Sequence, residues 1–475
     1  MSSVDGRRSW HIANLNSRFH TVVLVGFVAT LSYLAARLGG TVVIRPQADW
    51  PLWPGNVLLA SVLLLVPRRI WPILIAAAFA AFVLYNLQAG MPIRSIIVLL
   101  LSDAVEALTA ALGLSYSFEG VPQINSVKAL AKYSFFAVIL APLTGAFFGA
   151  LAAHGKYWTS WRISFLSEAL GYLTLMPAIL GWVTKGPAWA HKSLSHYLEA
   201  SAMLASLAVL GYFSFVSPWT VIAPALTIVP FLLWSALRFG STGVSSIMIA
   251  VAFLTIWGAV HGRGPFVGPE SIHNVPSLQL YLLFTAAPFM VLAVIVEEQK
   301  QTERSFRESE KRFRLVADTA PALIWMADAN KLRTYFNKPW LDFTGRCIDS
   351  QLGNGWAERV HPEDLQRCMD TYTQTFDRRE EFRMEYRLRR HDGEYRWVID
   401  IGVPRHNEDH SFVGYIGIGI DVTERKRAEE GLASVSRRLI DAQEQERIRI
   451  ARELHDDFGQ RLALLTNDLV SSCIS

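Results

Sequence analysis

Cysteine is scarce in this sequence, and its spacing excludes two kinds of site. The 475 residues contain three cysteines, Cys347, Cys368 and Cys473, and no two of them form a C-x-x-C pair. Disulfide frameworks and zinc sites both need cysteines in closely spaced sets. We therefore predict neither a disulfide scaffold nor a metal site, and a reducing compartment for the cysteines.

Two further absences narrow the possible functions. No P-loop and no other glycine-rich phosphate-binding motif occurs in the sequence, so no ATP-binding segment is expected within it. The N-terminal stretch MSSVDGRRSWHIANLNSR is polar for too long to begin a signal peptide, and no small-residue cleavage site follows it. The first apolar block is therefore predicted to be an uncleaved membrane anchor.

Apolar blocks fill the first part of the chain. Hydrophobic residues make up 51% of the sequence; they recur in blocks from Phe19 to Val296, whereas charges are dense from Glu297 onward. A membrane-spanning helix needs about 20 apolar residues. About ten spans are expected, although NVLLASVLLLV is short enough to be re-entrant: 20–40, 54–67, 70–88, 94–115, 129–153, 163–183, 197–216, 219–238, 241–261 and 277–296.

Basic residues indicate the orientation of these spans. With a cytoplasmic N-terminus, the inner segments hold more of them than the outer loops, as the positive-inside rule requires. An even number of spans then places everything after Glu297 in the cytoplasm as well. The inner set is Arg7, Arg8, Arg18, Arg68, Arg69, Lys128, Lys185, Lys192 and Arg238, and the outer set is Arg45, Arg94, Lys156, Arg162 and Arg263.

Three acids fall inside predicted spans. Asp103, Glu106 and Glu168 are costly in hydrocarbon, so they are candidates for a membrane ligand or ion site. The alternative is a polar bundle interior in which Asp103 and Glu106, spaced i,i+3, are hydrogen-bonded and inert.

Three longer stretches of the apolar half match a known pattern in order. They are WPGNVLLASVLLLVPRRIWP (53–72), WRISFLSEALGYLTLMPAIL (161–180) and FLLWSALRFGSTGVSSIMIAVAFLTIWGAVHGRGPF (231–266). Residues 20–297 resemble the first type of membrane-associated sensor (MASE) domain. The resemblance implies a bacterial polytopic input module. Many members carry Asp in the second of these stretches, where this chain has Glu168.

The following segment alternates like a half-buried sheet. In FRMEYRLRR, Phe382, Met384, Tyr386 and Leu388 fall on one face and charged residues on the other. HDGE supplies a turn, and YRWVIDIGV and FVGYIGIGIDV follow as strands of an antiparallel meander. Upstream, ALIWMADANKLRTYFN is predicted to be a hairpin and KPWLDFTG a short helix.

This segment resembles a PAS domain through GWAERVHPEDL, YRLRRHDGEYRW and GYIGIGIDVTERKRAEE. The family fold is a five-stranded antiparallel sheet with helices on one face. Gly417 and Gly419 on the last strand leave room either for a ligand or for tight helix-on-sheet packing; we favour packing and expect no cofactor. His361 is expected to cap a helix.

The end of the last strand is a candidate signal relay, because the PAS family transmits signal there. Its residues are Asp421, Thr423, Glu424 and Arg425. Thr423 is expected to cap the following helix, and Asp421 to bind Arg425.

The output segment begins as a coiled coil and continues as a bundle helix. Leu432, Val435, Leu439 and Ala442 recur at coiled-coil spacing. A second apolar stripe follows a break at QEQERIR, and the break lets two packings compete. The second stripe is Ile450, Leu454, Phe458, Leu462, Leu465 and Leu469.

His455 lies beside this second stripe and is followed by two acids. ERIRIARELHDDFGQRLALL (446–465) resembles the subgroup-3 dimerisation and phosphoacceptor domain of sensor histidine kinases. The resemblance implies that His455 accepts phosphate and that Gln460 orients the water that dephosphorylates the regulator. Asp456 is placed to hold the imidazole tautomer. The alternative is a solvated surface histidine.

The predicted fold class is multidomain: an all-α membrane bundle of about 8–10 helices, an α+β PAS domain and a C-terminal long helix. The boundaries are a cytoplasmic tail 1–19, a membrane domain 20–297, a linker helix 298–312, PAS 313–424, a coiled coil 425–445 and an incomplete phosphoacceptor helix 446–475.

The predicted function is that of a homodimeric, inner-membrane sensor histidine kinase in two-component signalling. With no ATP-binding domain found, we expect a C-terminally truncated kinase with ATP and Mg²⁺ supplied elsewhere, or a modulator of an intact kinase. A less favoured alternative is a PAS-gated transporter. The expected partners are the lipid bilayer and a helix-turn-helix response regulator, without direct nucleic-acid binding.

Overall fold

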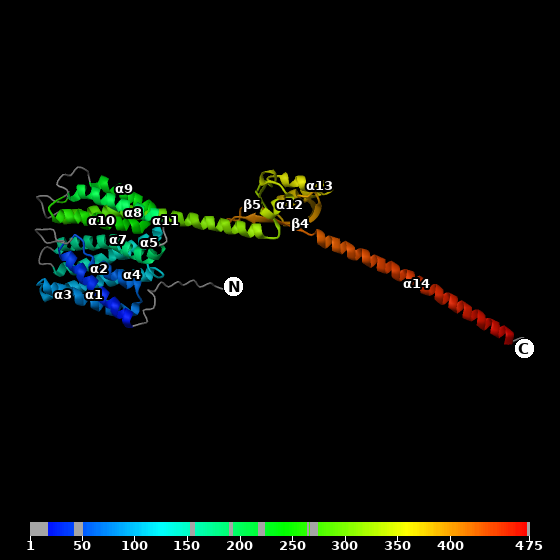
Figure 1. Ribbon diagram of the computed structural model, residues 1–475, viewed down its shortest axis with the longest axis horizontal. Helices are drawn as coiled ribbons and strands as arrows, with labels where there is room; N and C mark the ends of the chain where they lie inside the picture. Colours follow the sequence, from blue (N-terminus) through cyan, green and yellow to red (C-terminus); the bar gives the residue numbers. More distant parts are fainter. Residues whose placement is uncertain are drawn as a thin grey trace. The chain divides into compact units, whose positions relative to one another are not determined.

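The computed structural model describes residues 18–41, 51–152, 157–189, 193–216, 224–263, 266 and 274–472. The chain divides into two compact units, Met1–Arg304 and Ser305–Ser475. Each unit is described by itself below (Figure 1).

The first unit is helical throughout its described residues. Eight helical stretches among these residues are long and apolar enough to cross a bilayer, and two apolar helices, Gly55–Leu65 and Ile228–Arg238, are shorter. One of the eight, Val127–Ala152, contains both α5 and α6. The expected short block is therefore confirmed as α2, whereas residues 219–223 of the expected span 219–238 lie outside the described residues. The helices are α1 Arg18–Thr41, α2 Gly55–Leu65, α3 Trp71–Gln88, α4 Ile93–Ser117, α5 Val127–Tyr133, α6 Ala141–Gly149, α7 Tyr157–Trp189, α8 Leu194–Gly211, α9 Pro224–Arg238, α10 Gly240–Val260 and α11 Asn274–Thr319.

Helices α7 and α10 form the centre of this unit. In their apolar stretches, 78% of the residues of α7 and 61% of those of α10 are buried, whereas the other membrane-length helices have 17–39% buried. One cluster of buried side chains joins α2 and α4 to α7, and a second joins α7 to α10 and α11. Large apolar side chains such as Phe19, Phe253 and Phe284 remain exposed. Such an outer surface suits lipid hydrocarbon, where backbone groups must be paired within helices.

Helix α11 continues without a break from apolar to charged sequence. It contains 46 residues, with Pro288 inside it, and runs to Thr319. This one helix therefore contains three segments that are predicted separately from the sequence: the last predicted span 277–296, the linker helix 298–312 and the first predicted PAS residues 313–319.

The second unit contains the predicted five-stranded antiparallel sheet. Its strand order is β2-β1-β5-β4-β3, and the expected upstream hairpin is confirmed as β1 paired with β2. The strands are β1 Leu323–Ala327, β2 Arg333–Phe336, β3 Phe382–Arg389, β4 Tyr395–His406 and β5 Phe412–Asp421. Strand β3 buries the four residues that the alternation predicts, and Asp392-Gly393 forms the turn to β4.

Two helices pack against this sheet, and both have capped ends. Helix α12, Lys338–Thr344, begins at Asn337, whose side chain accepts from Trp340 N, and ends at Gly345 in the left-handed region. Helix α13, Pro362–Arg378, begins at His361, which accepts a hydrogen bond from Glu363 N. His361 therefore caps a helix, as the sequence predicts.

The chain then forms α14, a helix of 50 residues from Thr423 to Ser472. The predicted coiled coil 425–445 and the phosphoacceptor segment from 446 onward lie in this one helix. Its break segment QEQERIR is helical like the rest.

Candidate functional site

Three carboxyl groups of the first unit converge on one amide. The Nδ2 atom of Asn56 lies 3.0 Å from Asp103 Oδ1, 3.1 Å from Glu106 Oε2 and 3.4 Å from Glu168 Oε1. Asn56, Glu106 and Glu168 are buried, and Asp103 is half-buried. An amide nitrogen carries two hydrogens, so it cannot donate to all three carboxyl groups at once. The structure thus brings together the three acids singled out in the sequence, around a polar residue that was not.

Close helix packing positions Glu106. Asp103 and Glu106 lie one turn apart on α4, and α6 approaches them through Gly145 and Gly149, a G-x-x-x-G pair. A Cβ on Gly145 would lie 2.3 Å from Glu106 Oε2. The hydroxyl of Ser102 donates to the Gly145 carbonyl at 2.7 Å. Only glycine at this position leaves space for the Glu106 carboxyl.

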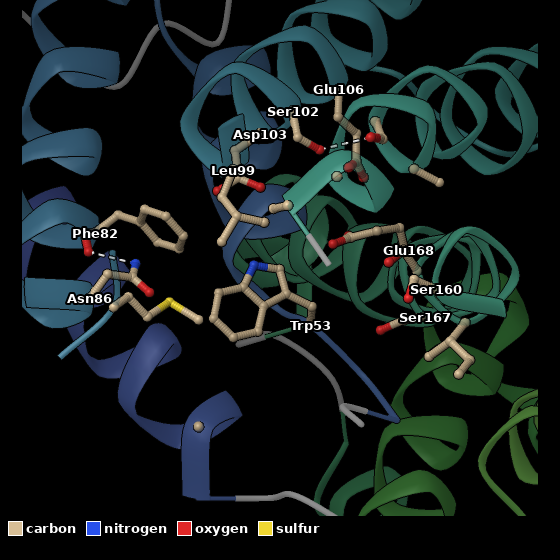
Figure 2. A pocket seen from close by; sticks show the side chains of 18 of the residues that line it. Trp53, Phe82, Asn86, Leu99, Ser102, Asp103, Glu106, Ser160, Ser167 and Glu168 are labelled. Atoms are coloured by element: carbon tan, nitrogen blue, oxygen red, sulfur yellow. Dashed lines mark hydrogen bonds between the residues drawn. The ribbon is translucent and has the colours of Figure 1, made fainter. Parts of the chain in front are cut away.

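The acids line a cavity of about 430 Å³. Figure 2 shows Glu168 and Ser167 directed from α7 toward the indole of Trp53, with Phe82 on the other side of the cavity. No Lys, Arg or His is among the described residues that line it. The lining therefore combines carboxyl groups, hydroxyl groups and aromatic surface.

The cavity lies toward one end of the helical unit. Gln279, near the start of α11, donates from Nε2 to the carbonyls of Pro51 and Ile163, each at 3.2 Å; Ile163 and nearby Trp53 line the cavity. Further along α11, Glu298 accepts from Val127 N at 3.0 Å. The cavity thus lies toward the end at which α11 begins, away from the end at which α11 leaves the unit.

His455 of α14 presents an open imidazole. Its side chain is 89% exposed, and its Nδ1 atom lies 3.7 Å from Asp456 Oδ1. That separation suits an ion pair but is longer than a hydrogen bond, so Asp456 reaches the ring only after a small side-chain movement. Gln460 lies one turn beyond Asp456, and Asp457 pairs with Arg461 at 3.1 Å.

The start of α14 is held by strand β4. Asp421 accepts from Thr423 N at 2.9 Å through Oδ1 and from Arg396 Nε at 2.9 Å through Oδ2. Arg396 also donates to Glu424 at 3.2 Å. Burial raises the pKa of Asp421, but the hydrogen bonds from Thr423 and Arg396 outweigh it, and the pKa is lowered overall. Asp421 therefore stays ionised at the helix start.

Two expectations for this junction are wrong. Asp421 binds Arg396 rather than Arg425, whose Nε lies 3.6 Å from Glu429 on the outer face of the helix. The hydroxyl of Thr423 does not cap α14, because it accepts from Trp397 N of β4 at 2.8 Å. The cap comes instead from the Asp421 side chain.

A buried ion pair occupies the interior of the PAS domain. Arg333 Nη2 lies 3.1 Å from Asp400 Oδ2, and both side chains are fully buried. The guanidinium lies between the rings of Trp325 and Trp356, 3.9 and 3.7 Å from their centroids. Asp400 also accepts from Trp325 Nε1 at 2.7 Å and from the Tyr386 hydroxyl at 3.0 Å.

The glycines of β5 make room for neighbouring strands. A Cβ on Gly417 would lie 2.2 Å from Trp325 Cζ2, and one on Gly419 would lie 3.1 Å from Val398. The favoured helix-on-sheet explanation is therefore wrong in detail, since the close neighbours are side chains of β1 and β4. At Gly417 the indole of Trp325 fills the space beside the strand, which leaves no room there for a ligand.

Sequence reasoning missed Asn56, Arg396 and the pair Arg333–Asp400. Each carries a signal that was available: an amide at the start of an apolar helix, and charged residues inside strand patterns. A polar group in such a place needs a partner. The sequence did not show which residue that partner is.

Comparison with known families supports all three resemblances drawn from the sequence. The MASE1 family model matches residues 24–300, the PAS fold model residues 333–419, and the histidine kinase model residues 446–470. The MASE1 match contains helices α2 to α10 and overlaps most of α1 and the first part of α11. The histidine kinase match contains His455, Asp456 and Gln460.

Three relatives show how these parts recur. "Uncharacterized protein y4lL" of Sinorhizobium fredii is 42% identical over 135 residues, 28% of this chain and 16% of that protein. Sporulation kinase C of Bacillus subtilis is 24% identical over 222 residues, which are 44% of this chain and 49% of that protein. "Probable diguanylate cyclase DgcE" of Escherichia coli is 22% identical over 442 residues, which are 90% of this chain and 37% of that protein. The chain spans about half or less of each relative. The MASE1 match alone covers more than half of the 475 residues, and this multi-pass membrane chain belongs to the MASE1 family, followed by a PAS fold and a histidine kinase segment.

Proposed function

We propose that this chain is the sensing and phosphoacceptor part of a two-component system. The observation that carries the proposal is the histidine kinase match over residues 446–470, with an open imidazole at His455 and a carboxylate beside it. The MASE1 and PAS parts do not decide the output, because a relative named as a diguanylate cyclase is similar over 90% of this chain.

The residues of α14 suit phosphoryl transfer from ATP to imidazole. Nδ1 of His455 faces Asp456, so Nε2 is the nitrogen free to attack the γ-phosphorus. A nitrogen–phosphorus bond forms, and the bond from the γ-phosphorus to the bridging oxygen breaks, leaving ADP with that electron pair. Asp456 accepts a hydrogen bond from Nδ1–H and so stabilises the imidazolium that forms when Nε2 bonds to phosphorus. The Nδ1 proton then passes to the Asp456 carboxylate, which leaves a neutral phosphohistidine. ATP and Mg²⁺ would come from an ATP-binding domain of the same protein or of a partner kinase.

The apolar stripe of α14 supports a homodimer. Leu432, Val435, Leu439, Leu454 and Phe458 are each more than half exposed. Exposed apolar side chains in a long repeating stripe are buried when two such helices pair. In such a dimer, His455 of one chain would lie within reach of an ATP-binding domain attached to the other chain.

Cellular placement and partners follow from the same proposal. The excess of basic residues on the segments assigned to the inside favours an inner-membrane protein with a cytoplasmic N-terminus and a cytoplasmic PAS domain. The phosphate of His455 would pass to an aspartate of a response regulator, which we propose to be of the helix-turn-helix type. Gln460 would position the water that later removes that phosphate.

Phosphate labelling of the full chain in lipid nanodiscs tests the proposal. The chain is incubated with [γ-³²P]ATP and Mg²⁺, with and without the ATP-binding domain of a histidine kinase. We expect acid-labile, alkali-stable label on the wild-type chain and none on His455→Gln. His406→Gln, which removes an exposed histidine of the PAS domain, is the matched control and should label normally. Label that persists in His455→Gln would contradict the assignment.

A further inference from the structure

We propose that the cavity of the membrane unit binds an organic amine cation with an apolar or aromatic body. The site is built around Asn56, Glu106 and Glu168, with the indole of Trp53 as an apolar wall. This proposal concerns ligand binding and stands apart from phosphotransfer at His455.

Unpartnered polar atoms point to a missing donor. Oε1 of Glu106, Oε2 of Glu168 and the hydroxyl of Ser167 are buried without a hydrogen-bond partner. All three side chains are at least nine-tenths buried, and all three line the cavity. A buried polar atom without a partner costs free energy. A ligand that carries N–H donors into the cavity would satisfy these atoms.

The charge of the lining selects a cation. Three carboxyl groups line the cavity, and no basic side chain is among its described lining residues. The amide of Asn56 supplies two hydrogens and no charge, so it cannot neutralise them. An anionic ligand would be repelled by each of these carboxyl groups that ionises. A positive charge beside them offsets the cost of ionising a buried carboxyl group, so a cationic ligand is favoured.

The geometry favours an organic cation over a bare metal ion. Among the described residues, no three His, Cys, Asp or Glu side chains are grouped so that they could hold a metal. A volume of about 430 Å³ is that of a small-molecule pocket. Trp53, Phe82 and Tyr85 add aromatic surface, which attracts organic cations and packs against an apolar body.

The position of the cavity suits a signal input. It lies toward the end where α11 begins, and α11 is the helix that continues from this unit toward the PAS domain. Gln279 of α11 is hydrogen-bonded to the carbonyl of Ile163, a residue of the cavity lining. A ligand between α4 and α7 therefore adjoins a residue bonded to α11.

Ligand binding to the full chain in nanodiscs tests the proposal. Equilibrium dialysis near neutral pH compares three probes that each carry a phenyl ring on a two-carbon chain. They are the cation 2-phenylethylamine, the neutral alcohol 2-phenylethanol and the anion phenylacetate. We expect saturable binding of the amine at least about tenfold tighter than that of the alcohol, and no saturable binding of the acid. Equal binding of the amine and the alcohol, or preference for the acid, overturns the proposal. These comparisons need only the unmodified chain.

Variants then locate the binding. Glu106→Gln and Glu168→Gln each remove one carboxyl group that could pair with the ammonium ion, and each should weaken amine binding at least about tenfold. Glu119→Gln is the matched control, because Glu119 is exposed and lies outside this cavity; its amine affinity should equal that of the wild type. Amine binding unchanged in both cavity variants would place the amine elsewhere and overturn the proposal. Normal His455 labelling in the same preparations separates this outcome from failure of the phosphotransfer proposal.

Discussion

Removing one member of the buried pair Arg333–Asp400 should destabilise the PAS domain strongly. Both side chains are fully buried, and they are 3.1 Å apart. Arg333→Met leaves Asp400 as a buried charge with two remaining donors, Trp325 Nε1 and the Tyr386 hydroxyl. Breaking such a pair typically costs about 3–5 kcal/mol. Because two donors remain and Met can pack between the indoles, we expect a value near the lower limit, about 3 kcal/mol.

Hydrogen exchange of the full chain measures this loss where it occurs. A loss of about 3 kcal/mol corresponds to exchange roughly 100-fold faster, since about 1.4 kcal/mol is a factor of ten. Peptides from β3, β4 and β5 should show this increase, because Asp400 lies on the strand between the other two. The matched control is Asp377→Asn, which breaks the surface pair Lys331–Asp377 of 2.7 Å with side chains 33% and 62% exposed. That change should cost at most about 1 kcal/mol.

A double variant separates the loss of the pair from the stranding of a charge. Arg333→Met combined with Asp400→Leu leaves no buried charge, so its cost should be clearly smaller than the sum of the two single costs. Additive costs, or exchange in Arg333→Met that equals the wild type, would refute the reasoning that each charge is held by the other.

Three further predictions concern other parts of the chain. Gly145→Val should reduce the melting temperature of the membrane unit, because a Cβ there would lie 2.3 Å from Glu106 Oε2. Overpacking of this kind costs about 1–3 kcal/mol of stability. An unchanged melting curve would contradict the prediction. Hydrogen bonds from Arg387 lower the pKa of Asp364 to about 2 from 3.8. The ionised Asp364 therefore stabilises the PAS domain fully above about pH 4, and this stabilisation is lost as the pH falls through about 2. Wild-type PAS domain should become more susceptible to pepsin over that range, and Asp364→Asn should show a smaller increase. An equal increase in the wild type and the variant would contradict this. In a cysteine-free background, Leu439→Cys should form an intermolecular disulfide much faster than Arg437→Cys on the opposite helix face; equal rates would argue against pairing along the apolar stripe.

Local periodicity accounts for the parts of the fold that the sequence predicts well. Strand β3 buries Phe382, Met384, Tyr386 and Leu388 because alternate residues of a strand face opposite sides. The turn at Asp392-Gly393 needs a residue at positive φ, and Gly393 has φ 93°. These features depend on a few neighbouring residues, so a single sequence contains enough information to place them.

Partners that are distant in sequence account for the errors. Arg425 is only four residues from Asp421 in the sequence, but its side chain on α14 lies beside Glu429. Strand pairing decides the true partner: Val398 lies opposite Asp421, which brings Arg396 to the same end of the sheet. Asn56 is 47 residues from Asp103 and 112 from Glu168. No pattern within one helix identifies contacts of that kind.

In the proposed function, the position of His455 beside the apolar stripe would let one helix both pair and react. Leu454, Phe458 and Leu462 lie at successive four-residue steps, so they form one ridge of α14 that drifts slowly around the helix. His455 follows Leu454 by one residue and is therefore rotated about 100° from the ridge. A partner helix that covers the ridge leaves the imidazole at the flank, where an ATP-binding domain can reach it. Had the histidine been on the ridge itself, pairing would bury the nitrogen that we propose attacks phosphorus.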